Sequence, residues 1–119
     1  MRNEESILRD EIKEFLKSYV NEFIKLNIDI SSLILFGSQA RGTATVLSDI
    51  DIAVVMIEPL TSLQRGLILN LPYDINENLE VNLFYTTEDA LQNAEHIFDT
   101  NKYIREEGIT LWQKSHTLN

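Results

Sequence analysis

The sequence predicts an α/β fold in which a small mixed β-sheet is flanked by α-helices, and three patterns predict it. Apolar residues recur every three or four positions over residues 7–26, as in an amphipathic helix. Short apolar runs at 33–36 and 52–57 have the length of buried strands, and residues 79–85 alternate between two faces. Because helices and strands alternate along 119 residues, we expect one layered domain spanning 1–119.

The first half of the chain is expected to hold one long helix and two central strands. Residues 7–26 place their apolar side chains on one face and their charges on the other, which predicts a core-packing helix. Residues 29–32 form a polar connection, and 33–36 a strand with both faces covered. One or two helical turns are expected at 39–41, before a second strand at 49–57.

The second half predicts two helices and two strands. Thr61 and Gln64 resemble a capping box that starts a short helix. Thr86 or Thr87 can cap a longer helix, which places His96 inside it and ends at Gly108. The expected elements are a helix at 62–71, a loop at 72–78, a strand at 79–85, a helix at 88–107, a strand at 109–112 and a flexible tail at 113–119.

Composition narrows the classes of function. The chain carries 19 acidic and 10 basic residues, a formal charge of −9, which argues against a general basic surface for long nucleic acid. It has no cysteine, so no disulfide framework is expected. The longest apolar run, Ile52–Ile57, is far shorter than a membrane helix, and the acidic start lacks a signal-peptide pattern. We therefore expect a soluble protein of the cytoplasm that does not insert into membranes.

Two aspartates open the second expected strand. Asp49 and Asp51 are two residues apart, so their carboxylates project from the same face, about 6.6 Å apart along the strand. Side-by-side carboxylates repel unless they are solvated or share a cation. Mg²⁺ suits the second case because it prefers oxygen ligands and bridges to phosphates. A solvated pair remains the alternative on this motif alone.

A glycine-serine turn follows the first expected strand. Gly37 lets the backbone turn sharply and approach a ligand, and a following short helix presents free N–H groups to an anion. The Ser38 hydroxyl and the Arg41 guanidinium can bind the same phosphate. The P-loop pattern of NTPases is absent. Taken alone, the turn could equally be an ordinary strand-to-helix connection.

The two motifs together carry a family resemblance. Ten residues separate Ser38 from Asp49, and the turn reads Gly-Ser-Gln-Ala-Arg-Gly. This resembles the Gly-Ser-x10-Asp-x-Asp signature of the nucleotidyltransferase superfamily that includes DNA polymerase β. The short chain and the segment from Arg105 to Ile109 are similar to the minimal, MNT-type members. The resemblance covers nearly the whole chain, and its specific part is Gly37 to Asp51.

The resemblance implies an enzyme that uses Mg²⁺ and ATP. Gly37, Ser38, Arg41 and Ser48 would bind the nucleotide phosphates, and Asp49 and Asp51 would hold the metal. Minimal members often pair with a HEPN-domain RNase toxin and silence it by attaching AMP to a tyrosine. The resemblance therefore implies a nucleotidyltransferase antitoxin with a HEPN toxin as partner. A transferase acting on an aminoglycoside-like molecule is a third reading, although such proteins usually carry an extra domain.

The sequence departs from the family pattern at its third carboxylate. In Leu79-Glu80-Val81-Asn82-Leu83 the aligned position holds Asn82, whose amide cannot act as a base. Glu80 shares its strand face and could replace the missing acid as a catalytic residue and metal ligand, or Asn82 could supply an amide oxygen. If neither serves, the protein would be a weak or inactive enzyme that neutralises its partner by binding alone.

Overall fold

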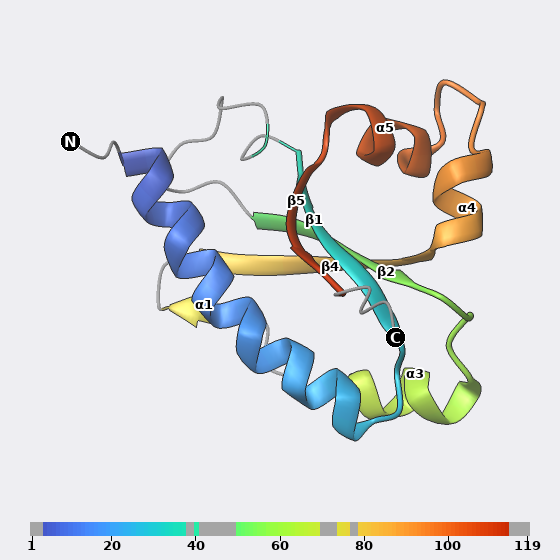
Figure 1. The fold of residues 1–119 in the computed structure, drawn as a ribbon, viewed down its shortest axis with the longest axis horizontal. Helices are drawn as coiled ribbons and strands as arrows, with labels where there is room; N and C mark the ends of the chain where they lie inside the picture. The colour runs from blue at the N-terminus through green and yellow to red at the C-terminus, as the bar shows by residue number, and fades with distance from the viewer. Residues whose placement is uncertain (1–3, 38–39, 41–49, 70–73, 77–78, 115–119) are drawn as a thin grey trace, which may run out of the picture.

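A five-stranded sheet in the order β3-β4-β2-β1-β5 forms the centre of the computed structural model (Figure 1). The structure describes residues 4–37, 40, 50–69, 74–76 and 79–114. Strands β2 and β4 run parallel, and the other neighbouring pairs are antiparallel. The strands are β1 (Ile30–Phe36), β2 (Ile50–Met56), β3 (Asp74–Asn76), β4 (Leu79–Thr87) and β5 (Ile109–Gln113).

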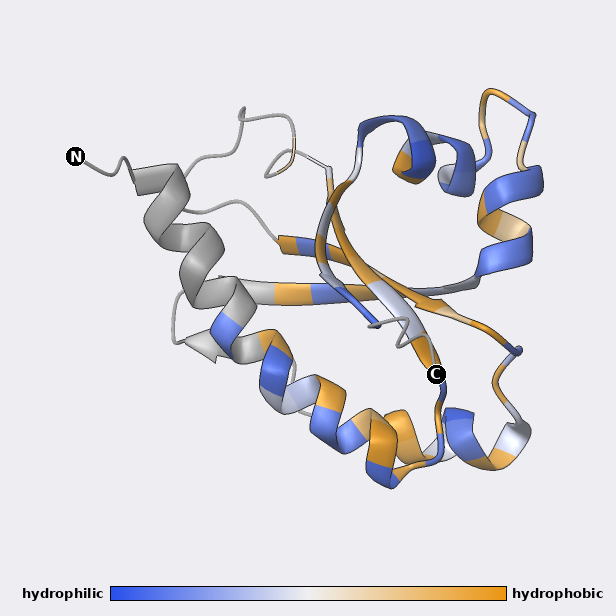
Figure 2. Ribbon diagram, in the orientation of Figure 1, coloured by the Kyte–Doolittle hydropathy of each residue, from blue (hydrophilic) through white to orange (hydrophobic). Residues whose placement is uncertain are grey.

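Helices cover both faces of the sheet, as the apolar runs predict. One face of β2 presents Ile50, Ile52 and Val54 to a core that includes Phe23 of α1 (Glu4–Lys25) and Ile68 of α3 (Ser62–Ile68). The other face presents Ala53 and Val55 to a smaller core with Ile104 of α5 (Thr100–Glu107) and Leu91 of α4 (Glu88–Asn93). Figure 2 shows hydrophobic residues along the strands and hydrophilic ones over α4 and α5. The predicted α/β architecture is confirmed.

The turn that ends α1 is hydrogen-bonded to the first turn of α3. Asn27 has φ +59°, and the N–H groups of Asn27 and Ile28 donate to the carbonyls of Ile24 and Phe23, both at 3.0 Å. This is the Schellman pattern, in which a left-handed residue ends a helix. The predicted capping box of α3 is present at Thr61, and the Gln64 side chain donates to the Asn27 carbonyl at 2.9 Å. Both helices are thereby held over the same face of the sheet.

Two segments that were expected to be connections belong to strands. Strand β1 starts at Ile30, so the expected polar connection is part of the sheet, with Ser32 paired to Val55. The loop expected at 72–78 contains β3, which pairs with β4. Two of its three residues, Asp74 and Asn76, are polar, which β3 tolerates as an edge strand with a hydrogen-bonded neighbour on one side only. Polar composition concealed both segments.

The single helix expected at 88–107 is wrong, because the chain forms α4 and α5 with an irregular segment between them. Asp99 caps α5 by accepting a hydrogen bond from the Asn101 N–H at 2.9 Å. Arg105 of α5 donates to the carbonyls of Leu91 and Gln92 at 2.8 and 2.9 Å, which satisfies groups at the end of α4. His96 therefore lies outside any helix. Capping side chains favoured two short helices over one long one.

The end of the chain returns to the sheet. Thr87 caps α4, and Gly108 follows α5, as predicted. Gln113 belongs to β5, and the Lys114 N–H donates to the Ser31 carbonyl at 2.9 Å, so the predicted tail starts too early. Its remaining part, 115–119, lies outside the described residues. None of the helices in the described part of the chain combines the length and the apolar character needed to cross a membrane.

Candidate active site

Three strands bring three candidate residues to one corner of the sheet. Strand β1 ends at Phe36, directly before Gly37, and Phe36 is the register partner of Asp51 in β2. On its other side Asp51 is the register partner of Asn82 in β4. Asp51 shares its strand face with Ala53, whose side chain is buried, yet Asp51 itself is half-buried. Strand β2 thus places the Asp51 carboxylate at the margin of the face that α4 and α5 cover.

Gly37 closes one side of this corner. Its φ is +76°, a left-handed conformation that other residues rarely adopt. A Cβ added at Gly37 would lie 2.4 Å from Oδ2 of Asp51, well inside van der Waals contact. The Gly37 carbonyl accepts a hydrogen bond from the Ala40 N–H at 3.1 Å, so the chain turns at once into a helical residue. Glycine is therefore required both by the backbone angle and by the Asp51 carboxylate.

Asn82 closes the opposite side. Its Nδ2 donates to Oδ1 of Asp51 at 3.3 Å, a long hydrogen bond between side chains that reach solvent. A carboxylate at this position would repel Asp51, whereas the amide holds it without adding charge. The two oxygens of Asp51 thus face different neighbours: Oδ1 faces the Asn82 amide and Oδ2 faces the Gly37 backbone. These two neighbours define the orientation of the carboxylate.

Glu80 occupies a different position along β4. Its register partner is Asp74 of β3, on the side of β4 away from β2. The register thus makes Asn82, rather than Glu80, the neighbour of Asp51.

The remaining predicted site residues are Ser38, Arg41, Ser48 and Asp49, and all four lie outside the described residues. Within the described part of the chain, no group of three or more His, Cys, Asp or Glu side chains could hold a metal ion. Asp51 is thus the described member of the expected metal pair. Its partners for a metal would come from Asp49 and from the Asn82 and Glu80 positions.

An aromatic cluster that the sequence did not signal adjoins the corner. The Phe36 ring lies 6.2 Å from the Phe84 ring and 6.4 Å from the Tyr103 ring, both in edge-to-face geometry. These rings come from β1, β4 and α5, which are far apart in sequence. Phe84 is two residues beyond Asn82 on the same face, so the cluster packs beside the carboxylate. The alternation of side chains along β4 was visible in the sequence. The contact between Tyr103 and Phe36 was not, because it depends on the residue at which α5 begins.

Comparison with known families places the chain as a whole. The sequence matches the family described as polymerase beta, nucleotidyltransferase, over residues 11–114. The chain belongs to this nucleotidyltransferase family. The match assigns the chain both a fold and a class of enzyme, and it confirms the family that the resemblance named.

One curated relative and two solved structures are similar to this chain. A protein of Methanocaldococcus jannaschii, MJ0126, named as a protein adenylyltransferase, is 32% identical over 83 residues, which cover 70% of this nucleotidyltransferase and 81% of the relative. A Sulfolobus solfataricus crystal structure described as a nucleotidyltransferase shares the fold, with a TM-score of 0.55, 17% identity, and coverage of 95% of this chain and 91% of that one. A toxin–antitoxin crystal structure with AMP-PNP has a TM-score of 0.46 and 28% identity, covering 79% of this chain and 73% of that one.

Proposed function

We propose that this nucleotidyltransferase transfers AMP from ATP to a tyrosine hydroxyl of a HEPN-domain RNase toxin, and thereby acts as its antitoxin in the cytoplasm. Membership of the family supports nucleotidyl transfer. The relative named as a protein adenylyltransferase supports AMP as the group and a protein as the acceptor. The single observation that carries the site is the Asp51 carboxylate held between Gly37 and Asn82.

The reaction balances as a displacement at the α-phosphorus. The acceptor hydroxyl oxygen forms a bond to this phosphorus, the bond to the β-bridging oxygen breaks, and pyrophosphate leaves. Asp51 together with Asp49 would hold Mg²⁺, which when bound would neutralise the phosphates and position the α-phosphate. Gly37, Ser38, Arg41 and Ser48 would bind the phosphates through backbone N–H, hydroxyl and guanidinium groups. A carboxylate oriented before the metal binds loses little freedom on binding it.

The proton of the acceptor hydroxyl needs an acceptor that Asn82 cannot provide. An amide has no basic oxygen or nitrogen at neutral pH, and here its nitrogen donates to Asp51. Glu80, two residues before Asn82 in the sequence, carries a carboxylate that could take the proton directly or through a water. The Asn82 amide would then keep Asp51 aligned while lowering the negative charge of the site by one.

Transfer of label from ATP tests this proposal. Purified protein is incubated with its HEPN-domain partner, expected in the adjacent reading frame, and with ATP labelled at the α-phosphate, with and without Mg²⁺. We expect Mg²⁺-dependent label on the partner that is lost in Asp49→Ala and Asp51→Ala. A Glu58→Gln variant, altered at an exposed acid beyond the far end of β2, should label like the wild type.

The amide at Asn82 favours a second candidate function, in which the protein neutralises the toxin by binding it and transfers no AMP. With an amide beside Asp51, transfer could be too slow to matter while the protein still covers its partner. Neutralisation that persists in Asp51→Ala with no label on the partner would support this candidate and contradict AMP transfer. Neutralisation lost together with the label would exclude it.

A further inference from the structure

The segment between α4 and α5 exposes two large apolar side chains next to each other. Ile97 is 75% exposed and Phe98 is 83% exposed. The top of this segment stands out as hydrophobic between two hydrophilic helices (Figure 2). Exposed neighbouring apolar groups of this size are typical of binding surfaces rather than of the general surface of a soluble domain. We call residues 95–98 the Phe98 loop.

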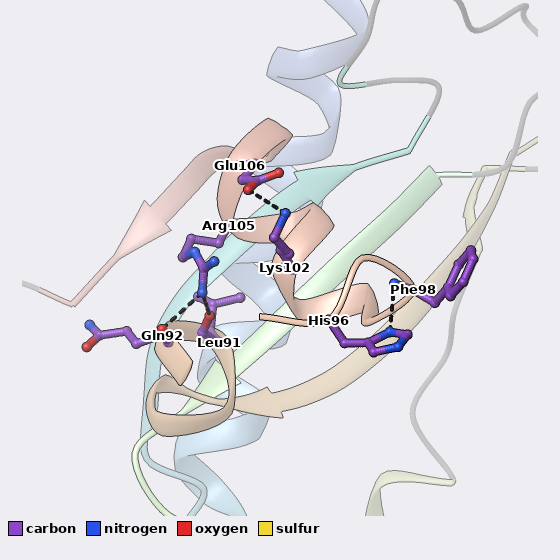
Figure 3. Close-up of polar contacts among 7 residues, drawn as sticks. All are labelled: Leu91, Gln92, His96, Phe98, Lys102, Arg105 and Glu106. Atoms are coloured by element: carbon purple, nitrogen blue, oxygen red, sulfur yellow. Dashed lines mark hydrogen bonds and ion pairs between the residues drawn. The ribbon is translucent and has the colours of Figure 1, made fainter. Parts of the chain in front are cut away.

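Hydrogen bonds brace the Phe98 loop and the two helices beside it. The Phe98 N–H donates to Nδ1 of His96 at 3.1 Å, and the two rings lie 5.5 Å apart (Figure 3). Asp99 fixes the following helix, and Arg105 fixes the preceding one through the Leu91 and Gln92 carbonyls. The Phe98 ring points away from the ribbon in Figure 3. A ring presented by an ordered loop loses little entropy when a partner covers it.

The surroundings of the Phe98 loop are acidic. Residues 88–107 hold six acidic and two basic side chains, which leaves a charge of −4 with histidine neutral. Both basic groups contact this chain itself: Lys102 pairs with Glu106 at 3.0 Å, and Arg105 binds carbonyls. Such a surface repels nucleic acid and anionic lipid, and it attracts a protein surface rich in Lys and Arg. An RNase that binds an RNA backbone has such a surface.

Helix α5 connects the Phe98 loop to the active-site corner. Tyr103 is one helical turn beyond Asp99, and its ring packs 6.4 Å from the Phe36 ring. Phe36 is the register partner of Asp51 and precedes Gly37. The loop and the carboxylate therefore lie on the same face of the sheet, joined by one short helix. A protein bound at the loop would have part of its surface close to the site.

We propose that the Phe98 loop docks the protein acceptor, with Phe98 and Ile97 entering an apolar pocket rimmed by Lys and Arg. This inference rests on the proposed function, since it names the surface that brings the acceptor hydroxyl to the Asp51 corner. The apolar pair supplies the buried centre of the contact, and the acidic residues of α4 and α5 form its charged rim.

Binding without ATP tests the docking surface independently of the chemistry. The wild-type protein and its Phe98→Ser variant are titrated into the HEPN-domain partner by calorimetry. We expect the variant to bind about 10- to 30-fold more weakly, as for loss of a central anchor, and wild-type affinity to fall as salt rises. The matched control is Leu63→Ser, an apolar residue of α3 that is 73% exposed on the opposite side of the sheet, and it should bind normally.

The two proposals fail in different ways. Wild-type affinity in Phe98→Ser, or no binding by the wild type, overturns docking at this loop. Weaker binding by Phe98→Ser with no label on the partner from the wild type supports docking and overturns AMP transfer. Sedimentation of each protein alone adds a third outcome: if the substitution abolishes self-association and leaves partner binding intact, the loop is a contact between copies and the proposal is wrong.

Discussion

The Asp51 corner and the α4–α5 segment are built by opposite means. The corner is set by strand register, and β2 holds it through side chains such as Ile50 and Ile52 that are fully buried. The α4–α5 segment is set by polar groups near the surface, among them Asp99 and Arg105. Strand register fixes positions closely, which suits a metal and a reacting phosphate. Surface capping fixes a loop well enough to present an apolar anchor, which suits recognition.

The largest expected effect is at the corner. Asp51→Asn keeps the shape of the side chain but removes the charge that would hold the metal, so AMP transfer should fall at least 100-fold, since even outer groups of metal sites are worth roughly 10–100-fold. Thermal unfolding should stay close to wild type because Asp51 is only half-buried. Transfer to the partner is measured at saturating ATP. A loss below about threefold, with no change in the Mg²⁺ requirement, would show that Asp51 is not a ligand.

Gly37→Ala perturbs the same corner through the backbone. Its Cβ would meet Asp51 at 2.4 Å with φ at +76°, so we expect a loss of about 1–2 kcal/mol in unfolding free energy together with a clear loss of transfer. Gly66→Ala is the matched control, because nothing lies within 4 Å of its Cβ and it sits inside α3. That control should gain up to about 1 kcal/mol. Urea unfolding measures the free energy of unfolding of both variants. A Gly37→Ala variant as stable as the wild type would contradict the geometry at Gly37.

Asn82→Asp tests which residue of β4 completes the site. An added carboxylate beside Asp51 restores the acid of the family pattern. We expect transfer to rise by at least about tenfold, because a well-placed general base contributes roughly 100- to 10,000-fold. Glu80→Gln, in contrast, should lower transfer if Glu80 now accepts the proton. Single-turnover rates separate the two substitutions. A rate that is unchanged or lower in Asn82→Asp would count against the register argument.

The smallest effect is expected in the α4–α5 segment. Asp99→Ala removes the cap of α5 and should lower the unfolding free energy by about 1 kcal/mol. It should also weaken partner binding, because the Phe98 loop loses its order. Thr61→Ala removes the equivalent cap from α3 at a similar cost in stability, and it should leave partner binding unchanged. If Asp99→Ala and Thr61→Ala bind the partner equally well, the cap of α5 does not contribute to partner binding.

The contrast between the regions also explains what the sequence could predict. Hydrophobic periodicity placed α1, β2 and β4, and the Gly-Ser and Asp-x-Asp motifs pointed to the corner, because each signal is local. The register that pairs Asp51 with Asn82 was expected only from the family pattern, since pairing between distant strands leaves no local mark. The break between α4 and α5 was missed because Asp99 and Arg105 act across a turn. Strand β3 was missed because an edge strand can be polar.

The proposed function requires that the Asp51 corner modifies the partner rather than only covering it. The most direct measurement takes the partner after incubation with this protein, ATP and Mg²⁺, separates the two proteins, and assays the RNase activity and the mass of the isolated partner. We predict a partner that stays inactive and carries AMP on a tyrosine, and an active, unmodified one after incubation with Asp51→Asn. An isolated partner that regains full activity without added mass, after incubation with the wild type, would contradict the account.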